Sequence, residues 1–101
     1  TNGEARLSTN NQSAIIEKLG DVTPNPVSQD ARLRISLKEA TTLKIEIINQ
    51  LGQIVLTENN SVNSGENHLE LQTGKLNEGL YILSITPSDG ISSYKKFIKL
   101  R

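Results

Sequence analysis

Two neighbouring segments in the first half of the chain alternate strictly between aliphatic and polar residues. The aliphatic residues that recur at every second position of RLRISL and TTLKIEII are Leu33, Ile35, Leu37, Leu43, Ile45 and Ile47. Successive side chains of a strand point to opposite faces of its sheet, so a period of two is typical of a strand with one buried face. The pattern therefore predicts two half-buried strands, over residues 32–37 and 41–48, with the aliphatic side chains turned inward.

Five further apolar runs are short enough to be strands, and residues typical of turns separate them. They cover residues 14–19, 53–58, 68–72, 80–86 and 93–101. NQLG, which ends at Gly52, should close a hairpin between the strands on either side of it, because its residues tolerate positive φ. NNSVNSGEN reads as a longer polar loop over residues 59–67, and PSDG as the turn before the last strand.

The number and spacing of these segments indicate the fold class. About seven short strands, with turn signals roughly every dozen residues and no long helical pattern, are typical of an antiparallel β-sandwich. The length of 101 residues allows one such domain and leaves no room for a second independent core. We therefore expect an all-β, immunoglobulin-like sandwich with its strands in two sheets.

The first 13 residues differ in composition from the rest of the chain. TNGEARLSTNNQS is polar, rich in Asn, Ser and Thr, and has Leu7 as its one large aliphatic residue, as is typical of a linker. We expect residues 1–13 to connect a preceding cargo region to a domain at residues 14–101. Because the sequence contains no Met, we also expect Thr1 to follow a longer N-terminal part of the same protein.

Charge and composition argue against several kinds of function. The eleven basic and eleven acidic residues cancel, which argues against binding nucleic acid or anionic membranes through overall charge. No apolar run approaches the about 20 residues that span a bilayer, so we expect no membrane insertion. Locally the balance is uneven, because the last seven residues hold four cations, Lys95, Lys96, Lys99 and Arg101.

The sequence offers no arrangement typical of catalysis, a metal site or a cofactor. His68 is the single histidine, and no cysteine accompanies it, so neither a zinc site nor a Ser-His-Asp triad is supported. Glu66 and Glu70 flank His68 but form a weak basis for a general acid/base pair. We expect a non-enzymatic domain in which His68 is a solvent-facing strand residue.

The segment LNEGLYILSI predicts a particular corner of the sandwich. In immunoglobulin-like folds a Tyr near the start of the sixth strand often donates its hydroxyl to a backbone group a few residues upstream. Tyr81 holds that position, and Gly79 would allow the unusual φ or close approach that such a corner requires. We expect a structural role for Tyr81; direct contact with a ligand is the less favoured alternative.

Four short motifs, taken in order, resemble those of a known family. They are PNP (Pro24, Asn25, Pro26), LG in the hairpin turn (Leu51, Gly52), L-x-x-G-x-Y-x-x-x-I (Leu76, Gly79, Tyr81, Ile85) and the Lys-rich terminal strand KKFIKL (95–100). Their order and spacing are similar to those of the C-terminal sorting domains (type A) of type IX secretion cargo proteins. The resemblance runs from about Val22 to Arg101.

The resemblance implies a function in protein export across the outer membrane of certain Gram-negative bacteria. It implies that the parent protein passes through the periplasm, and that the outer-membrane type IX translocon and a shuttle β-barrel protein recognise this domain. In many relatives a cell-surface sortase then removes the domain, and here it would cut within residues 1–22. The cargo would end at the cell surface or be secreted.

The terminal strand is the expected recognition element. On strict alternation, one face would carry Tyr94, Lys96, Ile98 and Leu100, and the other Lys95, Phe97, Lys99 and Arg101. The second face would be a row of cations interrupted by one aromatic ring, and at a sheet edge the backbone would be open to an added strand. The residues expected to take part in partner recognition are Lys95, Lys96, Phe97, Lys99 and Arg101. Lysines on an edge strand also prevent aggregation without any partner, and this alternative stays open.

A second class of function fits the same strand pattern. An immunoglobulin-like adhesion or carbohydrate-binding module of a secreted multidomain protein would have a similar sequence. Tyr81, Tyr94 and Phe97 are the only aromatic residues and are too few for a sugar-binding platform, whereas protein adhesion stays open.

Overall fold

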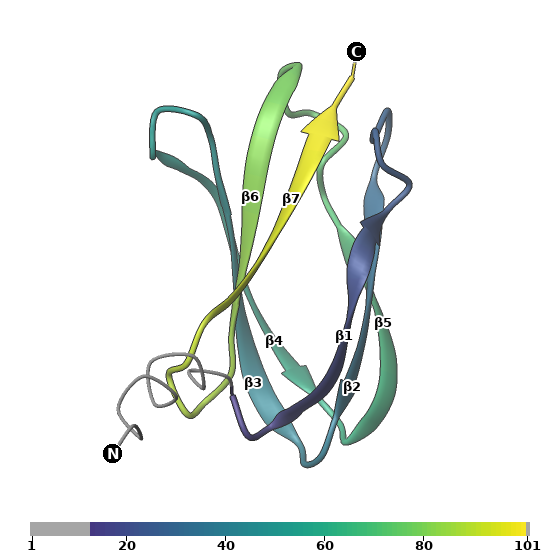
Figure 1. Cartoon of the computed structure of the whole chain (residues 1–101), viewed down its shortest axis with the longest axis vertical. Coiled ribbons are helices and arrows are strands. Elements are labelled where there is room, and N and C mark those ends of the chain that lie inside the picture. Colours follow the sequence, from purple (N-terminus) through teal and green to yellow (C-terminus); the bar gives the residue numbers. More distant parts are fainter. Residues whose placement is uncertain (1–12, 101) are drawn as a thin grey trace, which may run out of the picture.

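The computed structural model of the protein describes residues 13–100, and these residues form seven antiparallel strands and no helix (Figure 1). The strands are β1 (Ile16–Thr23), β2 (Ala31–Leu37), β3 (Thr41–Ile48), β4 (Ile54–Val62), β5 (Gly65–Leu71), β6 (Gly79–Thr86) and β7 (Ser93–Lys99). They form two sheets, with the strand order β1-β2-β5 in one and β4-β3-β6-β7 in the other. The all-β sandwich expected from the sequence is confirmed.

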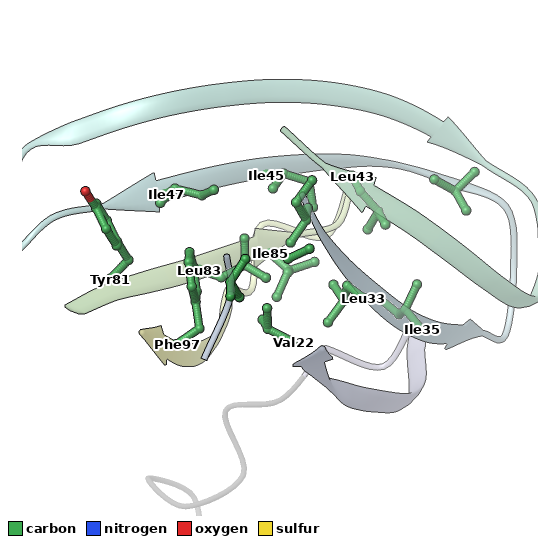
Figure 2. Close-up of a cluster of buried hydrophobic side chains, with 14 of the residues drawn as sticks. Val22, Leu33, Ile35, Leu43, Ile45, Ile47, Tyr81, Leu83, Ile85 and Phe97 are labelled. Carbon is green, nitrogen blue, oxygen red and sulfur yellow. The ribbon is translucent and has the colours of Figure 1, made fainter. Parts of the chain in front are cut away.

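The core lies between the two sheets and is built from the alternating positions of the central strands. Leu33 and Ile35 of β2 are fully buried, and so are Leu43, Ile45 and Ile47 of β3. Figure 2 shows side chains of the two sheets pointing toward one another in this cluster. Each such side chain stabilises the fold by about 1.5–3 kcal/mol when it leaves water. The inward faces predicted for residues 32–37 and 41–48 are therefore confirmed.

The boundaries of three strands differ by several residues from the predicted ones. The strands β4 and β5 extend through most of the region 59–67, so the polar loop predicted there is wrong. Four of its Asn and Ser residues pair along the ladders, as Asn59 does with Lys44 and Asn67 with Ile35. Polar residues suit these positions because β4 and β5 are the edge strands of their sheets. One face of each strand is in contact with water. The strand β1 begins later than predicted and continues to Thr23.

β3 and β4 form the predicted hairpin, and Asn49 holds its turn. The side-chain oxygen Oδ1 of Asn49 accepts hydrogen bonds from the backbone N–H groups of Leu51, at 2.9 Å, and Gln53, at 3.0 Å. Gly52 has a φ of 83°, which residues with a Cβ rarely adopt. The LG motif therefore has its glycine where the turn needs it.

The Tyr81 corner is also confirmed. The Tyr81 hydroxyl donates a hydrogen bond of 2.7 Å to the backbone oxygen of Asn77, four residues upstream. Gly79 opens β6 with a φ of 155°, and the expected role for a glycine at this point is thus met. The corner fixes where β6 begins, and β6 in turn pairs with both β3 and β7.

Candidate recognition surface on the terminal strand

The strand β7 lies at the edge of the four-stranded sheet, as expected for the terminal strand. It pairs with β6 along its length, in a register that places Lys99 opposite Gly79 and Phe97 opposite Tyr81. The other side of β7 faces β1, the edge strand of the second sheet (Figure 1). No strand of the described chain pairs with β7 on this side. Its backbone groups and side chains therefore decide what the strand can offer to a partner.

The turn before β7 is tied to the beginning of the described chain. The backbone N–H of Gly90 donates to the oxygen of Pro87, at 3.0 Å. The carboxylate of Asp89 accepts hydrogen bonds from Ser13 Oγ, at 2.6 Å, and from the backbone N–H of Ile91, at 3.0 Å. The bond from Ser13, and after it the bond from Ile91, hold the pKa of Asp89 below its ordinary value of 3.8, because both favour the ionised carboxylate.

The PNP motif closes part of the free edge of β7. Asn25 Oδ1 accepts a hydrogen bond of 3.0 Å from the backbone N–H of Ile98. Val27 then bonds β7 twice at 2.7 Å, through its own N–H to the oxygen of Ile98 and through its oxygen to the N–H of Leu100. Val27 itself is fully buried. The segment that contains Pro24 and Pro26 therefore covers the C-terminal half of the edge strand.

The N-terminal half of the same edge is open among the described residues. The backbone of Ile98 bonds outward to Asn25 and Val27. Because backbone direction alternates along a strand, the backbone groups of Tyr94 and Lys96 also point away from the sheet. An added strand could pair with this short stretch. Beside it lies an open hollow of about 420 Å³ between β1 and β7, lined in part by Ile16, Leu19 and Tyr94.

The cationic face of β7 points into the sandwich, which differs from the expected exposed row of cations. Phe97 is 1% exposed and Lys99 is 3% exposed. The ammonium group of Lys99 donates to the backbone oxygen of Leu100, at 2.9 Å. Lys95 reaches across to β1, where its Nζ lies 3.0 Å from Asp21 Oδ1. The physical reason is Phe97, whose ring belongs to the core and turns its whole face of the strand inward.

The exposed face of β7 is therefore the other one, and it is largely apolar. Tyr94, Ile98 and Leu100 are exposed, with Lys96 exposed among them. Lys96 is thus the one described cation of the terminal strand that stands free in solvent. Arg101, also expected in the recognition set, lies outside the described residues.

The remaining motif residues have structural positions. Ile85 is fully buried in the core, and Leu76 packs against the core from the loop before β6. His68 is exposed on β5, as expected, and its Nε2 lies 3.1 Å from Glu66 Oε2, which also pairs with Arg34. Among residues 13–100 no three His, Cys, Asp or Glu side chains cluster as metal ligands would. No helix within the same residues is long and apolar enough to cross a membrane.

Two features of this surface could not be expected from the motifs alone. The contact of Asn25 is one, because its partner, Ile98, lies far along the chain and no local pattern links the two. The exposure of Leu80 and Ile82 of β6 beside β7 is the other. Their alternation with Tyr81 and Leu83, which are buried, was the signal that could have revealed them.

One family model matches the chain over residues 21–100, and its description is "secretion system C-terminal sorting domain". The chain belongs to this family, the sorting domains of type IX secretion. The matched span contains all four sequence motifs and every strand apart from the beginning of β1. Membership implies a secretion-signal role, interaction with the secretion machinery and a secreted or cell-surface destination. Sorting domains of this kind are typically non-catalytic.

A solved structure is also similar to the sorting domain, although distantly. It is that of a protein described as a beta-galactosidase from Bacteroides fragilis; the match covers 81% of this chain and 15% of that chain, with 20% identity and a TM-score of 0.41. At this identity and TM-score the likeness supports no functional conclusion. No curated protein matches the sequence.

Proposed function

We propose that this sorting domain directs its cargo from the periplasm across the outer membrane, through the type IX translocon and a shuttle β-barrel protein that recognise the folded domain. The observation that supports this most directly is the family match over residues 21–100, which covers nearly the whole sandwich. The strand β7 lies at the edge of the β4-β3-β6-β7 sheet and its outer face is exposed, so it gives the machinery an accessible element.

Within the terminal strand the expected recognition residues divide into two groups. Lys96 is exposed and is placed to contact a partner directly. Phe97 and Lys99 are buried, so their contribution is to hold the shape of β7, and Lys95 is held by Asp21. Recognition by Arg101 stays part of the proposal.

We also propose that a cell-surface sortase removes the domain by cutting the chain before Ser13. Ser13 is buried and bonded to Asp89, and β1 pairs with β2 from Ile16 onward. A protease needs an extended, accessible segment, so a cut within β1 would require the strand to leave its sheet. Of the expected range 1–22, residues 1–12 are therefore the favoured part.

The test is an export assay in a host that has the type IX machinery. Residues 1–101 are fused behind a signal peptide and a fluorescent reporter, and the reporter is measured in the periplasm, on the cell surface and in the medium. We expect the reporter to leave the cell, and the N-terminal sequence of the released domain to begin at or before Ser13. Reporter that accumulates in the periplasm, while the sandwich is folded, would contradict the sorting function.

A matched fusion separates export from cleavage. A reporter joined to residues 13–101 keeps the folded sandwich and lacks the segment that we propose is cut. We expect this fusion to be exported and to stay uncleaved at the cell surface. Cleavage at the same rate as in the longer fusion would place the cut inside the sandwich and contradict the proposed position.

A further inference from the structure

One end of the outer face of the four-stranded sheet is apolar. Ile54 of β4, Leu80 and Ile82 of β6 and Ile98 of β7 are between 36% and 54% exposed. Antiparallel sandwiches usually carry polar residues on their outer faces. Four large aliphatic side chains that are held partly in water therefore need a reason.

The strand register brings these side chains together. Ile54 lies opposite Ile48, and Ile48 lies opposite Ile82. Leu80 lies opposite Ile98 in the next row. Directly opposite side chains of a sheet are about 4.5–5.5 Å apart at Cβ, so the rows form one continuous surface. We call the set Ile48, Ile54, Leu80, Ile82 and Ile98 the apolar patch.

The exposed aliphatic side chains gather at this end of the molecule, and Ile91, in the turn before β7, is the exception. Toward the other end of the same sheet, the outer positions are polar, and Lys44 pairs with Glu46 at 3.6 Å. The outer face of the three-stranded sheet carries charged residues, with Arg34 bonded to Glu66 at 3.1 Å. The apolar patch lies at the end of the sandwich that holds the C-terminal end of β7. Lys96 of β7 lies opposite Ile82 and completes the row of Ile54, Ile48 and Ile82.

The size of the apolar patch argues against a permanent second copy of the chain as its occupant. The apolar patch spans four strands, or three spacings of about 4.8 Å, and each of its two rows takes up about 6.8 Å along the strands. Its area is therefore roughly 200 Å². A stable dimer buries about 800 Å² on each partner. An apolar surface of this size instead suits a contact that forms and dissociates.

The charge at the patch indicates the chemistry of the partner. Lys96 is exposed, whereas Lys95 is engaged with Asp21 and Lys99 is buried. A single free ammonium group beside aliphatic side chains complements an apolar protein surface with one well-placed carboxylate. An anionic membrane would be matched better by a cluster of cations.

We propose that the apolar patch is the surface on which the folded domain docks transiently to a protein of the export machinery, whose contact surface is apolar and carries a carboxylate opposite Lys96. This inference rests on the proposed sorting function and names the part of the domain that carries it. The docking surface is the outer sheet face, including the exposed side of β7, rather than the cationic side of β7.

The test measures binding and export of the same variants. The double variant Ile82→Thr/Ile98→Thr removes the centre of the apolar patch and keeps β-branched residues that suit a strand. Ile91→Thr is the matched control, because Ile91 is also 36% exposed but lies in the turn before β7, outside the patch. The probe is the outer-membrane type IX translocon complex, purified in detergent and immobilised, with the purified domain as analyte.

We expect the double variant to lose at least about tenfold in affinity for the translocon complex, as for the loss of central interface anchors. We also expect it to be exported more slowly. Lys96→Glu should weaken binding and Lys96→Arg should retain it, while Ile91→Thr behaves as wild type. Circular dichroism and urea unfolding establish that each variant is folded.

Several outcomes would overturn the inference while leaving the sorting function in place. One is wild-type binding and export of the double variant; another is a wild-type domain that is exported but does not bind the purified complex. A wild-type dimer in sedimentation that the double variant abolishes, with translocon binding unchanged, would make the patch a self-association surface. Binding to vesicles of phosphatidylcholine and phosphatidylglycerol that the double variant loses, again with translocon binding unchanged, would make it a membrane contact. Failure of the wild-type fusion to leave the cell would instead contradict the sorting function itself.

Discussion

Tyr81 and Phe97 are the aromatic pair that joins the last two strands. Their ring centroids are 5.6 Å apart and their planes meet at 20°, and Figure 2 shows both rings on the same side of the core cluster. Tyr81 is also bonded to Asn77 through its hydroxyl. One residue therefore fixes both the loop before β6 and the face of β7 that turns inward.

The substitution Tyr81→Phe should lower the free energy of unfolding by about 1–3 kcal/mol, because the backbone oxygen of Asn77 would lose its partner in a partly buried position. The measurement is urea unfolding followed by circular dichroism. Tyr94→Phe is the control and should leave the transition unchanged, since Tyr94 is 62% exposed. Equal stability of Tyr81→Phe and wild type would show that the corner bond does not stabilise the fold.

Asp89 should make stability depend on pH in the acid range. Its folded-state pKa lies below the ordinary value of 3.8, so its stabilising contribution is complete above that value and is lost as the pH falls through the folded-state pKa. Urea midpoints measured between about pH 5 and about pH 2 should therefore fall less steeply for Asp89→Asn than for wild type. Parallel pH profiles for the two proteins would contradict the role of the Ser13 contact.

At the scale of the element, β7 is an edge strand that is only half open. The bonds from Asn25 and Val27 cover the backbone at Ile98 and Leu100. Covering an edge in this way protects a sheet against unwanted strand pairing. The PNP motif thus acts on the terminal strand, about 70 residues away along the chain, and leaves the segment at Tyr94 and Lys96 as the open part.

The substitution Asn25→Ala should expose the edge locally. Losing one hydrogen bond of this kind costs about 0.5–1.5 kcal/mol, and the backbone N–H of Ile98 would lose its acceptor. We expect faster amide hydrogen exchange at Ile98, measured by NMR, with little change in the strands of the other sheet. Asn59→Ala on the exposed side of β4 is the control, and similar exchange at Ile98 in both variants would count against the edge-covering role.

Removal of Phe97–Arg101 should unfold the domain as well as stop export. The deletion takes away the Phe97 ring from the core and the pairing with Val27, and large core truncations of Phe cost about 3–5 kcal/mol. Circular dichroism of the purified truncated domain should show loss of the cooperative transition. A truncated domain that stays folded and is not exported would instead assign recognition directly to these residues.

At the scale of the whole molecule, one continuous core holds the two sheets together. Each of the seven strands contributes at least one buried hydrophobic residue to it. Among described side chains no buried polar atom lacks a hydrogen-bond partner. Such a domain should fold without its cargo, which suits a signal that is read in the folded state.

Residues 13–101 alone should therefore unfold in one cooperative transition. Leu33→Ala at the centre of β2 should lower the free energy of unfolding by about 2–5 kcal/mol, a large share of the about 5–15 kcal/mol of a small domain. Urea unfolding followed by circular dichroism and by Tyr fluorescence should give coincident curves. Separate transitions for the two probes would show that the sheets unfold independently.

The period-two pattern was enough to predict the strands, the two-sheet class and the inward faces of β2 and β3, because those faces carry aliphatic residues while the opposite faces are mostly polar. The Tyr81 corner was predictable for a similar reason, since its bond to Asn77 is local in sequence. The loop 59–67 was not, because polar edge strands lack the apolar signal that marks a strand.

The sequence by itself determined which residues of the terminal strand share a face, since strict alternation follows from the geometry of any strand. Only the tertiary structure decided which of the two faces is buried, because both carry apolar residues and lysines, and the choice depends on pairing Phe97 with Tyr81. The closure of the edge by Asn25 was likewise decided by the fold, which brings together segments that no local pattern connects.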